Sequence, residues 1–136
     1  MDVNEFKQIV EDLKEKSLPE EIKESVMAML DSKSEQIVVL DIKAFSDVTD
    51  YLIICNGNSD RHNRAIVDEV QKQIRDRFNR KPMHVEGEDH AQWILIDYAD
   101  FVVHVFALDN RVRYSLEKLW MDGKRYNFYP DRQSDG

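Results

Sequence analysis

Apolar residues in the first part of the chain recur at helical spacing and lie opposite charged residues. Two such stripes lie within residues 1–33, separated by Pro19, which suits the first turn of a second helix. Asn4 is a candidate cap for the first helix. The stripes therefore predict two amphipathic helices. Their apolar members are Phe6, Ile9, Val10, Leu13, Ile22, Val26, Met29 and Leu30.

Five short segments further along the chain predict strands. The first is apolar at consecutive positions, which favours burial on both faces. The last two are apolar strands joined by a tight acidic turn, which predicts an antiparallel hairpin. The five segments are residues 36–42, 49–56, 81–85, 91–97 and 101–106.

A long helix is predicted after Gly57, with Asn58 or Ser59 as its cap and Arg80 near its end. Ile66, Val70, Ile74 and Phe78 give it one buried stripe, because they recur at every fourth residue. A last helix is predicted over 109–120, with its apolar residues Val112, Leu116, Leu119 and Trp120 packed against the sheet.

This order of elements predicts an α/β (mixed α+β) fold, with a mixed sheet of about five strands flanked by helices. A length of 136 residues fits one domain. No apolar run is long enough to span a membrane, and residues 1–14 lack the pattern of a signal or transit peptide. Cys55 lies alone in an apolar strand, which favours a buried thiol in a reducing, cytoplasmic setting.

The formal net charge is −8, which argues against extensive contact with a nucleic-acid backbone. An acidic surface favours basic protein partners, although acidity also serves solubility alone. The four histidines, with one cysteine, show no metal-binding spacing. We expect neither a metal nor another cofactor.

Three segments carry candidate chemistry. The turn from Gly57 to Arg61 precedes a helix and is either an anion site or a plain turn with a helix cap. Asp97 and Asp100 are either a functional carboxylate pair or ordinary turn residues. Strand alternation puts Trp93 on the same face as Asp97, where it is either core or an exposed anchor for a partner.

Six sequence blocks, taken in their order and spacing, resemble the Iojap, or ribosome silencing factor (RsfS), family. The resemblance covers about residues 25–122. It predicts a domain over 25–120, an added helical segment over 1–24, and a polar, partly disordered tail over 121–136. The blocks are IVVLDI (37–42), TDYLIICNGNSDRH (49–62), AIVDEV (65–70), VEGE (85–88), WILIDYADFVVHVF (93–106) and YSLEKLW (114–120).

The resemblance implies a repressor of translation that binds the large ribosomal subunit through a basic ribosomal protein, number fourteen, and keeps the small subunit from joining. Trp93 is then the central anchor, with an acidic and aromatic turn beside it. Two departures from the family pattern are Ala99, where glycine is usual, and Met121, where a small residue is usual. The partner-binding residues implied are Trp93, Asp97, Tyr98, Asp100, Glu86, Glu88, His104, Ser59, Asp60 and Arg61.

Two alternatives stay open. The family's fold resembles that of nucleotidyltransferases, which suggests a nucleotide-binding or nucleotidyltransferase-like protein. However, Asp68 and Glu69 are adjacent on a helix and cannot form the required carboxylate pair, so we expect no enzyme. A homodimer built from the Trp93 face and a sheet edge is the second alternative.

Overall fold

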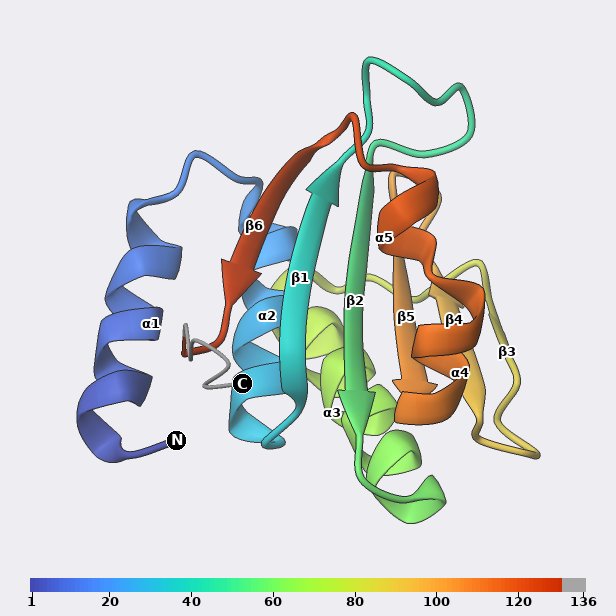
Figure 1. The fold of residues 1–136 in the computed structure, drawn as a ribbon, viewed down its shortest axis with the longest axis horizontal. Coiled ribbons are helices and arrows are strands. Elements are labelled where there is room, and N and C mark those ends of the chain that lie inside the picture. Colours follow the sequence, from blue (N-terminus) through green and yellow to red (C-terminus); the bar gives the residue numbers. More distant parts are fainter. Residues whose placement is uncertain (131–136) are drawn as a thin grey trace, which may run out of the picture.

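The computed structural model describes residues 1–130, which fold around one mixed sheet (Figure 1). The helices are α1 (Val3–Glu15), α2 (Glu20–Asp31), α3 (Asp60–Phe78), α4 (Leu108–Tyr114) and α5 (Leu116–Leu119). The strands are β1 (Glu35–Asp41), β2 (Tyr51–Gly57), β3 (His84–Glu86), β4 (Trp93–Asp97), β5 (Phe101–Ala107) and β6 (Lys124–Phe128).

The sheet has the strand order β3-β4-β5-β2-β1-β6. Only β2 and β5 pair in parallel, across the connection that contains α3, and the other neighbours pair antiparallel. This confirms the predicted mixed sheet and the hairpin of β4 and β5. The sixth strand, β6, comes from the segment assigned to the tail. It pairs with the outer edge of β1, where Phe128 lies opposite Ile37. Residues 131–136 of the predicted tail lie outside the described part of the chain.

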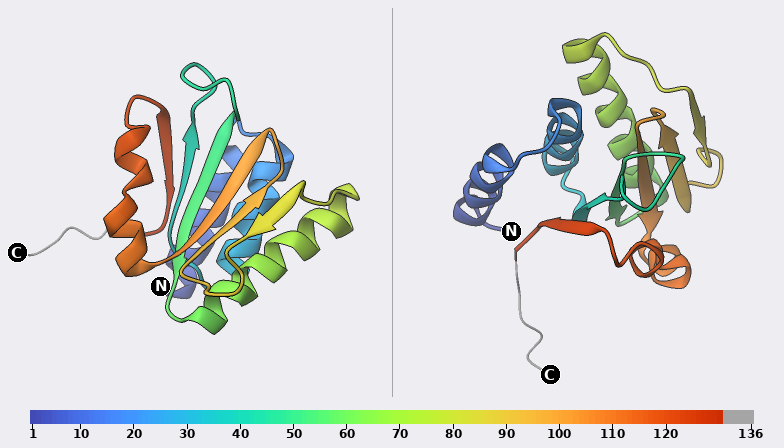
Figure 2. Two further views of the ribbon diagram at one scale, coloured as in Figure 1. Left: turned by 90° about the vertical axis from the view of Figure 1, so that its right-hand side faces the viewer. Right: turned by 90° about the horizontal axis from the view of Figure 1, so that it is seen from above.

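One face of the sheet is sealed by helices α1, α2 and α3 (Figures 1 and 2). Alternate strand residues point to these helices and form a large apolar core with the helical stripes. The predicted stripe of α3 is confirmed for Ile66, Val70 and Ile74, which are fully buried. We call this side the sealed face. Its strand residues include Ile37, Val39, Ile53, Cys55, Ile94, Ile96, Phe101, Val103 and Val105.

The opposite face is only partly covered. Helix α4 packs against β2 and β5, and a second apolar cluster lies under α4 and α5. Both faces of β1 and β2 are therefore buried, as the unbroken apolar run of β1 predicted. Trp120 packs against this cluster, which confirms its predicted contact with the sheet. The cluster consists of Val38, Leu40, Ile42, Leu52, Ile54 and Phe106.

The last helix differs from its prediction in two ways. It is broken at Ser115, whose φ of 47° is left-handed, so that α4 and α5 are separate short helices. The predicted inward orientation is confirmed for Leu116 and Trp120, which pack against the second apolar cluster. It is wrong for Val112 and Leu119, which are exposed, while Arg111 is buried. The Arg111 guanidinium donates to the Gln36 carbonyl at 2.7 Å and the Asn56 side-chain oxygen at 2.8 Å. It also pairs with Glu117, and these bonds fix the orientation of α4.

The helix caps follow the expected chemistry with one correction. Helix α1 is capped by Asp2, not Asn4, because the Asp2 carboxylate accepts from the Glu5 amide at 2.8 Å. Helix α3 is capped by Ser59, one of the two predicted candidates, and ends at a left-handed Asn79. No helix within residues 1–130 is long and apolar enough to cross a membrane.

Candidate functional site

An accessible surface lies over β3, β4 and β5 on the side of the sheet that α4 and α5 cover only in part. Cross-strand pairing arranges its side chains in rows, because Leu95 lies opposite both Glu86 and His104, and Asp97 lies opposite both His84 and Val102. We call this surface the open face. It consists of His84, Glu86, Trp93, Leu95, Asp97, Val102 and His104.

Trp93 is half-buried at one end of the open face. Its ring lies 4.9 Å from that of Phe106 and 4.7 Å from that of Tyr114, measured between centroids. The indole nitrogen donates a hydrogen bond of 3.0 Å to His104 Nδ1. The side chain is thus held in one orientation while part of it stays accessible. Trp93 therefore combines features of both sequence interpretations: it packs against the second apolar cluster, as a core residue would, and stays partly exposed, as an anchor would.

His104 is almost completely buried, with 6 % of its surface exposed. Burial lowers the pKa of its imidazole to about 4, because water no longer solvates the charged form. The ring is therefore neutral at physiological pH. The structure brings His104 and Trp93 into direct contact. They lie on different strands, and the sequence did not predict the register that brings them together.

Tyr114, at the end of α4, extends the open face beyond Trp93 and was not selected from the sequence. Val112 is 68 % exposed and Tyr114 is 51 % exposed, and Leu108 lies one turn before Val112 with over half its surface accessible. At 3.6 residues per turn, Leu108 and Val112 lie on one flank of α4 and Tyr114 lies on the opposite flank, where its ring contacts Trp93. The spacing of Val112 and Leu116 predicted a stripe, but only the bonds of Arg111 determine which side of α4 turns inward.

The turn after β4 carries three of the implied residues but does not lie beside Trp93. Trp93 and Asp97 are at opposite ends of β4, about 13 Å apart at 3.3 Å per residue. The Asp97 carboxylate accepts from the Ala99 amide at 2.8 Å, and Ala99 has a left-handed φ of 75°. Asp97 is therefore the turn residue that its alternative interpretation predicted, while its other carboxylate oxygen remains close to His84 at 3.7 Å.

Tyr98 faces the sealed side and is 1 % exposed, so it is not accessible to a partner. Its ring stacks on Phe101 with 4.7 Å between centroids, and the guanidinium of Arg80 lies over it. Burial raises the pKa of the Tyr98 hydroxyl to about 12. Asp100 is exposed but pairs with Arg80, which also binds Glu21 of α2. These contacts give Tyr98 and Asp100 a structural role in joining the hairpin to the helices.

The turn before α3 is occupied by its own side chains. Ser59 Oγ accepts from the His62 amide at 3.0 Å, and His62 Nδ1 accepts from the Asn58 amide at 3.0 Å. The Asp60 carboxylate accepts a hydrogen bond of 2.6 Å from the side chain of Gln92, the residue that precedes Trp93. Arg61 is exposed. The amides that an anion would need are thus already satisfied at Asn58 and His62.

The loop after β3 is held at its backbone and leaves its carboxylates accessible. Arg64 donates to the backbone carbonyls of Glu88 and Asp89 at 2.9 and 2.8 Å. Glu88 itself is exposed. Glu86 lies on the open face, and its carboxylate is 3.2 Å from His84 Nε2. Both glutamates are therefore accessible at the surface.

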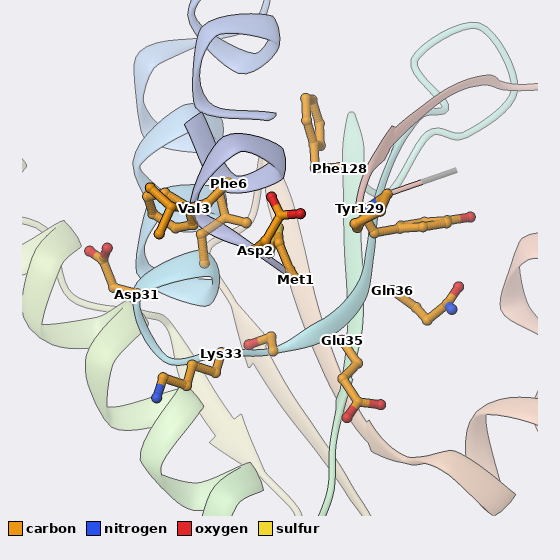
Figure 3. Close-up of a pocket in the computed structure, with 13 residues that line it drawn as sticks. Met1, Asp2, Val3, Phe6, Asp31, Lys33, Glu35, Gln36, Phe128 and Tyr129 are labelled. Carbon is orange, nitrogen blue, oxygen red and sulfur yellow. The ribbon is translucent and has the colours of Figure 1, made fainter. Parts of the chain in front are cut away.

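The remaining features do not suggest catalysis. Within residues 1–130, no three His, Cys, Asp or Glu side chains are grouped to hold a metal ion. Burial raises the pKa of the Cys55 thiol to about 12, which leaves it unreactive. A groove of about 1080 Å³ lies between the start of α1, the α2–β1 turn and the end of β6 (Figure 3), and contains none of the implied partner-binding residues.

The sequence profile of the family described as "Ribosomal silencing factor during starvation" matches residues 15–135. The chain belongs to the RsfS family. The match begins before and ends after the range over which the sequence blocks suggested the resemblance, and it includes β6. Members of this family are named for silencing ribosomes, which is a regulatory role.

Individual relatives agree with the family profile. The ribosomal silencing factor RsfS of Bacillus subtilis is 44 % identical over 101 residues, which cover 74 % of this chain and 85 % of that protein. "Mitochondrial assembly of ribosomal large subunit protein 1" of Mus musculus is 31 % identical over 97 residues, covering 70 % of this chain and 42 % of that one. The crystal structure of protein CV0518 from Chromobacterium violaceum superposes with a TM-score of 0.72 at 29 % identity, covering 80 % of this chain and 89 % of that one.

Proposed function

We propose that this RsfS-family protein binds the large ribosomal subunit through its basic ribosomal protein number fourteen and blocks joining of the small subunit. It thereby represses translation in the cytoplasm. The observation that carries the proposal is the open face, where a half-buried, oriented tryptophan lies among aromatic side chains and carboxylates lie further along the same face. The name of the mouse relative, which refers to the ribosomal large subunit, supports the choice of subunit.

The shape of the open face suits a protein partner. Trp93 offers a large apolar surface at low entropic cost, because Phe106, Tyr114 and His104 already fix its ring. Tyr114, half exposed at the end of α4, continues the apolar area beyond Trp93. Interfaces commonly have such an aromatic centre, with polar groups at the rim.

The charge of the open face favours a basic partner. Glu86 and Asp97 lie on it, Glu88 is exposed in the loop that follows β3, and the whole chain carries a formal charge of −8. Carboxylates speed encounter with a basic protein and disfavour contact with the surrounding ribosomal RNA. Silencing then needs only the bulk of the bound domain, because a rigid body on the intersubunit surface excludes the small subunit.

The alternatives receive less support from the geometry. For nucleotide transfer, the turn at Gly57 is crowded, because a Cβ there would lie 2.2 Å from Asn63 Oδ1. The amides next to it are also occupied by Ser59 and His62. A homodimer through the open face would compete with the ribosome for Trp93, and size-exclusion chromatography over a range of protein concentrations measures this directly.

The test is a sucrose gradient of purified ribosomal subunits at fixed magnesium, with and without the protein. We expect the protein to migrate with the large subunit and the peak of joined ribosomes to decrease. Adding the protein to ribosomes that have already joined is the control for order of binding, and should have a smaller effect. Migration with the small subunit, or with neither subunit, would contradict the proposal.

A further inference from the structure

The pair formed by His104 and Trp93 has a fixed proton arrangement. An indole nitrogen can only donate a hydrogen bond, so His104 Nδ1 must accept and carry no proton. The ring is neutral, because burial lowers its pKa well below neutrality. The single ring proton therefore lies on Nε2, and Trp93 selects this tautomer of His104.

His104 Nε2 is then a hydrogen-bond donor without an acceptor among residues 1–130. No hydrogen bond joins this atom to another described residue. The side-chain atoms that are buried from solvent and lack a partner are Ser34 Oγ, Thr49 Oγ1, Asn63 Oδ1 and Tyr98 Oη, and Nε2 is not one of them. Nε2 therefore keeps access to solvent, and the pairing of His104 with Leu95 places the side chain on the open face.

We infer that His104 is a positioning and specificity-determining residue of the open face, which holds the Trp93 ring and presents an Nε2–H donor to a hydrogen-bond acceptor of the partner protein. The inference rests on the proposed function. A partner that covers the open face displaces water from Nε2–H. It must then supply a carbonyl or carboxylate oxygen, since an unpaired buried donor weakens binding.

This arrangement discriminates between partners of similar shape. An apolar surface alone accepts many partners, because packing tolerates small changes in shape. A fixed donor beside the anchor rejects a partner that lacks an acceptor at that place. Because the His104 ring is buried between Trp93 and Phe106, it cannot turn away to avoid the mismatch.

Two substitutions separate the two roles. His104→Asn keeps an acceptor near the Nδ1 position and removes the donor at Nε2. His104→Gln places its amide near the Nε2 position and removes the acceptor for Trp93. His90→Asn is the matched control, because His90 is an exposed histidine on the loop before β4. Trp93 fluorescence, recorded in a Trp120→Phe background, reports whether the indole stays in place.

The measurement is the affinity of each variant for purified large subunits, together with the imidazole nitrogen NMR shifts of the free protein. We expect His104→Asn to retain the Trp93 fluorescence but bind about tenfold more weakly. His104→Gln should shift the fluorescence, and His90→Asn should match the wild type. In the wild type, the NMR shifts should show the proton on Nε2.

The outcomes distinguish the inference from the proposed function. If the wild type binds and His104→Asn binds equally well, the inference is wrong and the proposed function stands. If the wild type does not bind the large subunit, both fail. Should His104→Asn not fold, Trp93→Phe gives the same test, since it keeps an aromatic ring but releases Nδ1. Unchanged affinity and an unchanged tautomer in Trp93→Phe would also overturn the inference.

Discussion

The two faces of the sheet use aromatic residues in opposite ways. On the sealed face, Tyr98 and Phe101 stack on each other under Arg80, and both are at most 1 % exposed. On the other face, Trp93 contacts Phe106 and Tyr114, but Tyr114 is 51 % exposed and Trp93 is only half-buried. The first cluster lacks a surface that a partner could reach, whereas the second is ordered and still accessible.

This difference separates residues that maintain the fold from residues available for binding. The hairpin of β4 and β5 contributes to both, because successive residues in a strand point to opposite faces. A substitution on the sealed face should therefore change stability, and one on the open face should mainly change binding. The predictions below test this separation, from the largest expected effect to the smallest.

Phe101→Ala should destabilise the protein by about 3–5 kcal/mol, because it leaves a cavity between the sheet and the helices. Phe101 has no exposed surface. Urea unfolding followed by circular dichroism measures this free energy. A loss below about 1 kcal/mol would show that the sealed face is less tightly packed than its burial indicates.

Arg111→Met should cost about 3 kcal/mol, since it leaves Glu117, the Gln36 carbonyl and the Asn56 side chain without their common donor. It should also loosen α4 and Tyr114, so binding to the large subunit should weaken. Hydrogen exchange across 108–119 checks the local effect. If exchange there stays unchanged, another contact must hold α4 over the sheet.

Acid should destabilise the protein through His104. Its folded pKa of about 4 lies below the ordinary value, so the unfolded chain binds a proton that the folded chain does not. Stability should therefore fall as the pH decreases from about 6.5 towards 4, by about 2 kcal/mol between pH 7 and pH 5. His104→Asn, which keeps the other histidines, should lack this share. Equal pH dependence in both proteins would refute the assignment.

Glu86→Gln should change stability by less than about 0.5 kcal/mol, because its carboxylate is largely exposed and pairs only with His84. It should instead lower the association rate with the large subunit and reduce its salt dependence. Stopped-flow binding at two ionic strengths measures both. A faster association would contradict a basic partner at this edge.

Much of the fold follows from local pattern, and part of the binding surface does not. The strands β1 and β2, the hairpin and the stripe of α3 were predictable, because their apolar spacing matches a single period. The inward turn of Arg111 was not, since its partners come from positions 36, 56 and 117. Strand β6 was missed because only Phe128 is buried, with Tyr126 half-buried, and its partner β1 lies far away in the sequence.

The candidate site shows the same division. Strand alternation was sufficient to place Trp93 and Asp97 on one face, but not to show that they lie at opposite ends of it. The family resemblance placed Tyr98 near the partner, whereas the turn directs it into the sealed core. The contact between Trp93 and His104 depends on the register of β4 with β5, which the sequence does not specify.

The most direct test compares the two tryptophans, since both pack against the same apolar cluster but only Trp93 lies on the open face. The measurement is the affinity of folded Trp93→Ala and Trp120→Ala variants for the purified large ribosomal subunit. We predict a loss of about thirtyfold for Trp93→Ala, as for an interface anchor, and less than about threefold for Trp120→Ala. Unchanged binding by Trp93→Ala, or equal losses in both variants, would contradict the claim that the open face is the ribosome-binding surface.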